Sequence, residues 1–146
     1  MSLLFPELNR KKTLENVSDF FKKDYERLLL MSGKKLTDLS SPTLSGVPGS
    51  SAGNTNETKL VDGISAIDFI AAVEDTINHC SYNSEIILHE LFIKKRSWDE
   101  VQGMVYSEHY KFSYLRRQAM FEFADGFNYW QKVHHCEPKI NLNSYD

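Results

Sequence analysis

Apolar residues recur at helical spacing in several stretches of the chain, and this pattern predicts an all-α fold. In the first stretch they lie three and four residues apart, from Thr13, which can cap a helix, to residues 31–33, where the helix should end. These apolar positions are Leu14, Val17, Phe21, Tyr25 and Leu28. The charges between them are of mixed sign, which is typical of a solvated face. No segment predicts a β-strand.

Segment 37–58 differs in composition from the helices on either side. It is rich in Ser, Thr, Gly, Pro and Asn and contains few large apolar residues, which is typical of a linker or a long loop. Because structureless stretches of this length are unusual inside a compact domain, we expect a domain boundary here. The predicted organisation is an N-terminal helical segment 1–36, the linker 37–58, a helical domain 59–133 and a flexible tail 134–146.

Two more helices are predicted before residue 97. An apolar stripe indicates a helix over 57–80, and Ser84 can cap the next one, which should end at Lys94, Lys95 and Arg96. Cations at the end of a helix complement the negative end of its dipole, which is the simpler explanation for these three residues. Contact with DNA phosphates is the second explanation.

The stretch 97–124 has the pattern of a helix-turn-helix. Ser97 and Glu100 have the spacing of a capping box, so a helix should begin at Ser97. Gly103 follows closely, and Ser107 can cap a longer helix that runs to about Ala124. A short helix, a tight turn and a longer helix are therefore expected in this order.

In the longer helix, the apolar positions predict an inward face and leave polar groups opposite to it. Phe112, Leu115, Ala119 and Phe123 follow the helical period. The other side is expected to carry groups that can reach phosphates and base edges, namely His109, Tyr110, Lys111, Ser113, Tyr114, Arg116 and Arg117. A purely structural alternative places Tyr110 and Tyr114 in a broad apolar face and leaves the arginines solvated.

Composition and charge limit the hypothesis that this helix binds DNA. The 146 residues and the hydrophobic fraction of 41% suit one ordinary domain or two very small ones. The net charge of -3 and the pI of about 5.9 give no overall attraction to nucleic acid. Even segment 84–125 holds seven carboxylates against six cations. DNA binding would therefore depend on a few well-placed side chains and on partners.

Catalytic and metal-binding motifs are missing from the sequence. It has no Gly-rich phosphate loop, no His-Glu-x-x-His and no nucleophile elbow, so we expect a non-enzyme without a cofactor. Histidines and cysteines supply ligand types suited to zinc but lack the paired spacing of a structural site, so we expect no bound metal. They are His79, Cys80, His134, His135 and Cys136.

The cysteine count and the apolar runs indicate the compartment. Two cysteines are too few for a disulfide framework, which favours a reducing environment. The apolar start is too short for a signal peptide, and no apolar run is long enough to span a membrane. We expect a cytoplasmic protein without membrane contact.

Several segments are similar to one protein family. They are Leu-Phe-Pro-Glu-Leu at 4–8, Leu-Thr-Asp-Leu-Ser-Ser-Pro-Thr at 36–43, Gly-Val-Pro at 46–48, Gly-Asn at 53–54, Ser-Trp-Asp-Glu-Val at 97–101, Tyr-Ser-Glu at 106–108 and Ala-Met-Phe-Glu-Phe-Ala at 119–124. Together they resemble the ArpU-type autolysin-regulator family of Gram-positive phages and prophages. The resemblance implies a C-terminal helix-turn-helix similar to region 4 of sigma factors. It also implies a role as a transcription regulator of late genes for packaging and lysis, acting with host RNA polymerase.

The sequence therefore predicts a regulator that binds specific double-stranded DNA, with the helix 107–124 in the major groove. One alternative is a small terminase-like protein that recognises DNA for packaging. Another is a helical adaptor that binds a protein partner through Tyr129, Trp130 and the linker without touching DNA. The oligomeric state is left open, a homo-oligomer included.

Overall fold

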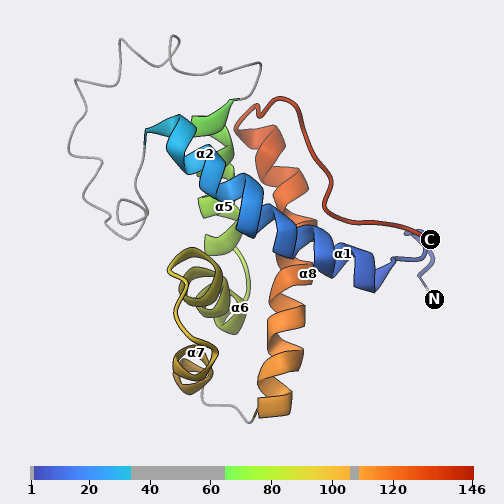
Figure 1. Cartoon of the computed structure of the whole chain (residues 1–146). Helices are drawn as coiled ribbons and strands as arrows, with labels where there is room; N and C mark the ends of the chain where they lie inside the picture. The colour runs from blue at the N-terminus through green and yellow to red at the C-terminus, as the bar shows by residue number, and fades with distance from the viewer. Residues whose placement is uncertain (1, 34–64, 106–108) are drawn as a thin grey trace.

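The computed structural model describes residues 2–33, 65–105 and 109–146, and these are mostly helical (Figure 1). Within these ranges there is no strand, only an isolated bridge between Leu8 and Tyr145. The predicted all-α class is confirmed for this part of the chain. The elements are α1 (Arg10–Asp19), η1 (Phe20–Asp24), α2 (Tyr25–Ser32), α5 (Ala66–Asn78), α6 (Tyr82–Ile87), η4 (Leu88–Ile93), α7 (Trp98–Met104) and α8 (His109–Val133), where η marks a π-helical turn.

The first helix is continuous through α1, η1 and α2, and it begins earlier than predicted. Its N-cap is Asn9, whose side-chain oxygen accepts a hydrogen bond from Lys12 N at 3.0 Å. Thr13, the predicted cap, lies buried inside α1, and its hydroxyl accepts a hydrogen bond from Ser144 N at 3.0 Å. The end is as predicted, because Gly33 takes the left-handed conformation (φ 79°) that suits a helix C-terminus.

The π-helical turn η1 turns two consecutive aromatic residues into the core. Neighbouring residues of an α-helix point about 100° apart, and the wider turn changes this register so that Phe20 and Phe21 are both buried. The ring centroid of Phe21 lies 4.8 Å from that of Phe123, and that of Phe20 lies 5.2 Å from that of Phe127. The first helix thus packs directly on α8.

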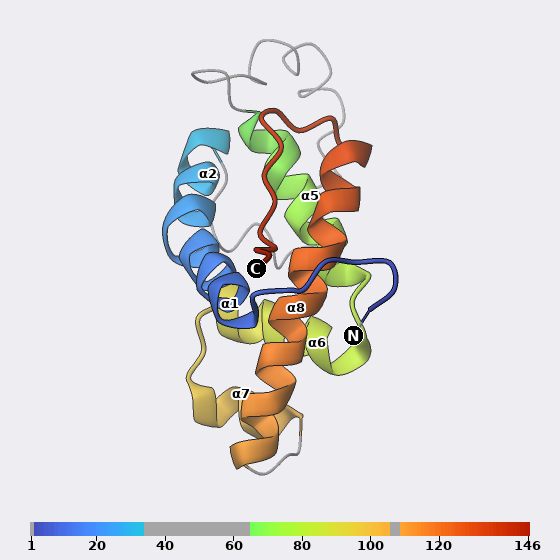
Figure 2. The ribbon, with the colours of Figure 1, turned by 90° about the vertical axis from the view of Figure 1, so that its right-hand side faces the viewer.

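This packing changes the predicted domain organisation. The N-terminal helical segment, 1–36, shares one hydrophobic core with the helices of the predicted domain 59–133. Figure 2 shows α1 and α2 lying along one side of α5 and α8. The apolar stripe of the first helix is buried against α5 and α8, so the helices on both sides of the predicted linker contribute to the same core. The predicted linker, 37–58, lies outside the described residues.

The start of α6 depends on a side chain from α8 rather than on the predicted cap. The N-cap is Ser81, and Ser84 lies inside the helix. The carboxylate of Glu122 accepts hydrogen bonds from Ser81 N (2.8 Å), Ser81 Oγ (2.8 Å) and Ser84 Oγ (2.9 Å). Glu122 therefore satisfies donors at the start of α6 and fixes the α5–α6 turn to α8. Of the helix predicted over 57–80, α5 lies within the described part, and residues 57–64 lie outside it.

Glu122→Gln is expected to destabilise the fold by about 1–3 kcal/mol, because the amide keeps the shape but loses the charge-assisted hydrogen bonds. Urea unfolding followed by circular dichroism measures the change. Glu15→Gln, which alters an exposed carboxylate of α1, serves as the control and should stay within about 0.5 kcal/mol of the native chain. Equal stability of the two variants would contradict this role of Glu122.

The last helix and the C-terminal segment are more ordered than predicted. α8 continues past Ala124 to Val133, because Phe127 and Gln131 extend its buried stripe. The buried amide of Gln131 donates from Nε2 to Ile140 O and accepts from Ile140 N, both at 2.8 Å. Leu142 is buried, and Asn9 N donates to Ser144 O at 2.8 Å. The predicted flexible tail 134–146 is thus packed on the first and last helices.

Gln131→Met is expected to free this segment, because it leaves the N–H and C=O of Ile140 without their partner. The loss should be about 1–3 kcal/mol, and amide hydrogen exchange at residues 139–146 should become faster. Gln118→Met makes the same chemical change on the same helix, away from that segment. Unchanged amide hydrogen exchange at residues 139–146 in Gln131→Met would show that Gln131 does not hold the C-terminal segment.

Candidate nucleic-acid interface

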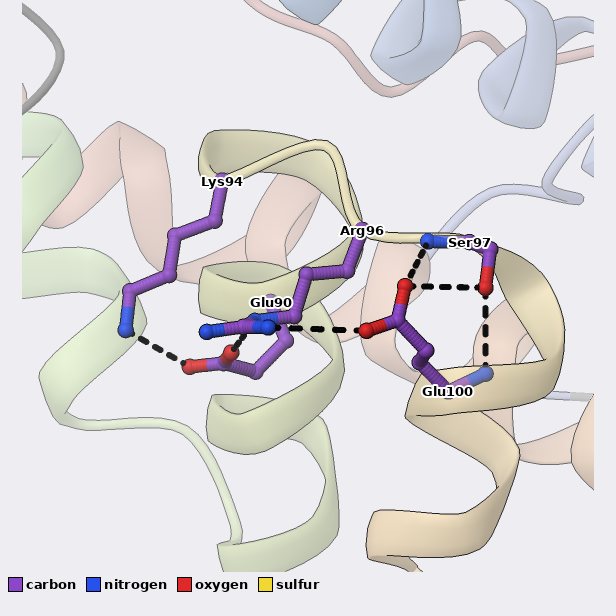
Figure 3. Close-up of polar contacts among 5 residues, drawn as sticks. All are labelled: Glu90, Lys94, Arg96, Ser97 and Glu100. Carbon is purple, nitrogen blue, oxygen red and sulfur yellow. Dashed lines mark hydrogen bonds and ion pairs between the residues drawn. The ribbon is translucent and has the colours of Figure 1, made fainter.

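The helix α7 begins at the predicted capping box (Figure 3). Ser97 Oγ accepts a hydrogen bond from Glu100 N at 3.2 Å, and the Glu100 carboxylate accepts one from Ser97 N at 3.3 Å. The backbone hydrogen bond from Ser97 is the main reason why the pKa of Glu100 is lowered, so the carboxylate is ionised at neutral pH. The predicted start of α7 is confirmed. The cap predicted at Ser107 lies outside the described residues.

The three cations before α7 are paired with carboxylates of the protein. Glu90 binds Lys94 (3.1 Å) and Arg96 Nε (2.6 Å), and Arg96 Nη1 also lies 3.6 Å from Glu100 (Figure 3). Lys95 has a left-handed backbone (φ 60°) and pairs with Glu26 of α2 at 2.8 Å. These pairs fix the turn between η4 and α7 to the rest of the fold. A phosphate would have to compete with carboxylates that already neutralise these charges.

Arg116 lies on the opposite side of α8 from the one we predicted. It is four residues from both Phe112 and Met120, which are buried, so it belongs to their face of the helix. Its guanidinium carbon lies 5.5 Å from the ring centroid of Trp98 and 5.7 Å from that of Phe92. Burial, and secondarily Arg117, lower its pKa, although an arginine stays protonated. Arg116 thus connects α8 to α7 and η4 and does not point outward.

Arg116→Ala is expected to destabilise the fold by about 1–2 kcal/mol, because two cation–π contacts and the packing of the side-chain stem are lost. Arg116→Met should recover part of the loss through its apolar stem. Lys111→Ala, at an exposed position of α8, should change stability by less than about 0.5 kcal/mol. If thermal and urea unfolding gave Arg116→Ala and Lys111→Ala the same free energy of unfolding, this structural role of Arg116 would be wrong.

Several of the predicted polar groups lie on the outward face of the first half of α8. Lys111 is exposed, and Tyr114 is 51% exposed. Arg117 is half-buried and donates from Nη1 to Ser113 Oγ at 2.7 Å, which fixes its direction. Gln118, seven residues after Lys111, lies on the same face, and the helical period could have identified it. The backbones of His109 and Tyr110 belong to α8, but their side chains are outside the described set.

The histidines and cysteines considered as metal ligands have other neighbours. His134 Nε2 lies 2.5 Å from Asp75 Oδ2, and the ring of His79 packs at a tilt against Trp130 with centroids 4.4 Å apart. Burial raises the pKa of both Cys80 and Cys136 to about 12, so both thiols are protonated at neutral pH. Within the described residues, no three His, Cys, Asp or Glu side chains gather where they could hold a metal ion.

Comparisons with known proteins identify no relative: no family model, no curated protein and no solved structure matches this chain. Among the described helices, none is long and apolar enough to cross a membrane.

Proposed function

We propose that this chain is a DNA-binding transcription regulator that uses α7 and the first half of α8 to recognise a specific double-stranded sequence. The outward face of α8 carries the proposal, with Lys111, Tyr114 and Gln118 side by side and Arg117 held by Ser113. Lysine, arginine and glutamine are the side chains that hydrogen-bond to base edges in the major groove. In Figure 1, α7 and the start of α8 lie together at one end of the molecule, beyond α1 and α2.

The resemblance of the sequence to ArpU-type regulators supports the biological setting of the proposal. In that setting the chain acts in the cytoplasm of a bacterial host on phage or prophage late genes, together with RNA polymerase. Because this surface carries only a modest charge, we expect RNA polymerase or a second copy of the chain to strengthen its binding to DNA. The ion pairs of Lys94, Lys95 and Arg96 with Glu26, Glu90 and Glu100 leave few cations for phosphates. His109 and Tyr110 remain predicted contacts.

The full chain should enrich one sequence motif from a library of random-sequence duplexes at low salt. On the enriched duplex, Lys111→Ala combined with Gln118→Ala is expected to weaken binding at least about tenfold, because each lost base contact costs about 1–3 kcal/mol. Fluorescence anisotropy at fixed salt measures the dissociation constant. Lys132→Ala is the matched control, because Lys132 is an exposed lysine near the other end of α8.

Either of two outcomes would overturn the proposal. One is a library from which the wild-type chain enriches nothing, and the other is equal binding by the double variant and Lys132→Ala. Enrichment with the expected loss, but of a duplex that gives no promoter activation in a reporter strain, would move the function to a small terminase-like packaging protein.

A protein-binding adaptor is the second candidate, because the C-terminal half of α8 exposes an aromatic side chain. Tyr129 is 61% exposed and packs edge-on against Trp130, with centroids 5.0 Å apart. Exposed aromatic side chains of this kind are enriched at protein interfaces. Binding of purified RNA polymerase that resists nuclease, survives Lys111→Ala and fails with Tyr129→Ala would favour this candidate.

A further inference from the structure

Three consecutive large apolar side chains near the N-terminus face the solvent. Leu3, Leu4 and Phe5 are 101%, 84% and 68% exposed. Their turn is fixed, because Ser2 Oγ accepts hydrogen bonds from Leu4 N (3.2 Å) and Phe5 N (3.1 Å). Exposed apolar runs are avoided in soluble proteins unless something binds them. We call residues 2–5 the N-terminal hook.

An apolar groove that such a hook could fill lies beside α2. It has a volume of about 330 Å³ and is formed by α2 with its preceding π-turn, by α5 and by the C-terminal segment. Asp24 and Arg27 are exposed at its edge. The groove, called the α2 groove, is lined by Phe20, Asp24, Arg27, Leu28, Met31, Phe69, Pro138 and Ile140.

The hook cannot reach the groove of its own molecule. Asn9 N donates to Ser144 O (2.8 Å) and Asp146 N donates to Glu7 O (2.9 Å), which anchors the residues that follow the hook. Phe5 precedes Asn9 by four residues, a reach of about 14 Å at most. Arg27 lies farther along the helix that Asn9 caps, at about 27 Å with a rise of 1.5 Å per residue. Figures 1 and 2 both place the N-terminus and α2 at opposite sides of the molecule.

We propose that the hook of one molecule inserts into the α2 groove of a second copy. Charges beside the two surfaces are complementary. Glu7 is exposed two residues after Phe5, and Arg27 is exposed at the groove. Lys11, in the first turn of α1, offers the opposite charge to Asp24. Within the described residues, none of these four side chains has an ion pair of its own.

The hook and the groove are different surfaces, so the contact is head-to-tail. Each bound molecule still offers a free hook or a free groove, and further copies can add until a ring closes. A second copy therefore accounts for both the exposed hook and the apolar groove that the described residues form.

Sedimentation and light scattering of the full chain over a range of concentrations test this proposal. The mass should rise from 16.9 kDa toward multiples of it. Leu4→Ser combined with Phe5→Ser should keep the chain at the monomer mass at every concentration. Leu30→Ser is the matched control, because Leu30 is an 81% exposed leucine of α2 outside the groove, and it should associate like the native chain.

A mixing experiment separates this head-to-tail contact from any other association. Met31→Lys should block the groove, and Arg27→Glu replaces it if that variant fails to fold. The hook variant and the groove variant should each be monomeric, and their mixture should form a dimer, because one intact groove then meets one intact hook. A wild-type chain that stays monomeric, or a mixture without dimer, would overturn the proposal, whatever the outcome of the DNA experiments.

Discussion

The packing of Phe20 and Phe21 against Phe123 and Phe127 joins helices from opposite ends of the sequence into one hydrophobic core. The π-turn that buries both N-terminal phenylalanines also brings Phe21 within 5.1 Å of Phe92 in η4, measured between ring centroids. Phe92 in turn lies beside the guanidinium of Arg116, which also contacts Trp98 of α7. The position of the candidate interface is thus connected to the hydrophobic core through an unbroken series of aromatic contacts.

Features with local partners could be predicted from the sequence, and features with distant partners could not. The capping box at Ser97 and the end of the first helix at Gly33 depend on residues within a few positions, and both were predicted. The pairing of Lys95 with Glu26 leaves no trace in the local sequence. Arg116 is a different case, because its spacing from Phe112 and Met120 placed it on the buried face, while its charge suggested an exposed one. The C-terminal segment was predicted to be flexible because it follows the last helix at the end of the chain, and its anchoring to Gln131 across a turn leaves no local pattern.

The cations of the candidate interface contribute less positive potential than their number suggests, because carboxylates of the protein pair with several of them. Glu26, Glu90 and Glu100 hold the cations before α7, which gives these carboxylates a structural purpose and reduces the positive potential of the surface. Exposed pairs of this kind are individually weak, so their main effect is to fix the direction of the turn. If the proposed function is correct, neutral donors such as Gln118 and Tyr114 would contribute to the recognition of DNA beside Lys111.

The uninterrupted course of α8 has a mechanical consequence. Its 25 residues span about 37 Å at 1.5 Å per residue, from the side of α7 to the far end of the core. Glu122 in its middle holds the α5–α6 turn, and Gln131 near its end holds the C-terminal segment. A load applied to the first turns of α8 therefore meets no hinge within the helix. A tilt of its first turns would displace the α5–α6 turn and the C-terminal segment, because both are attached along the same helix.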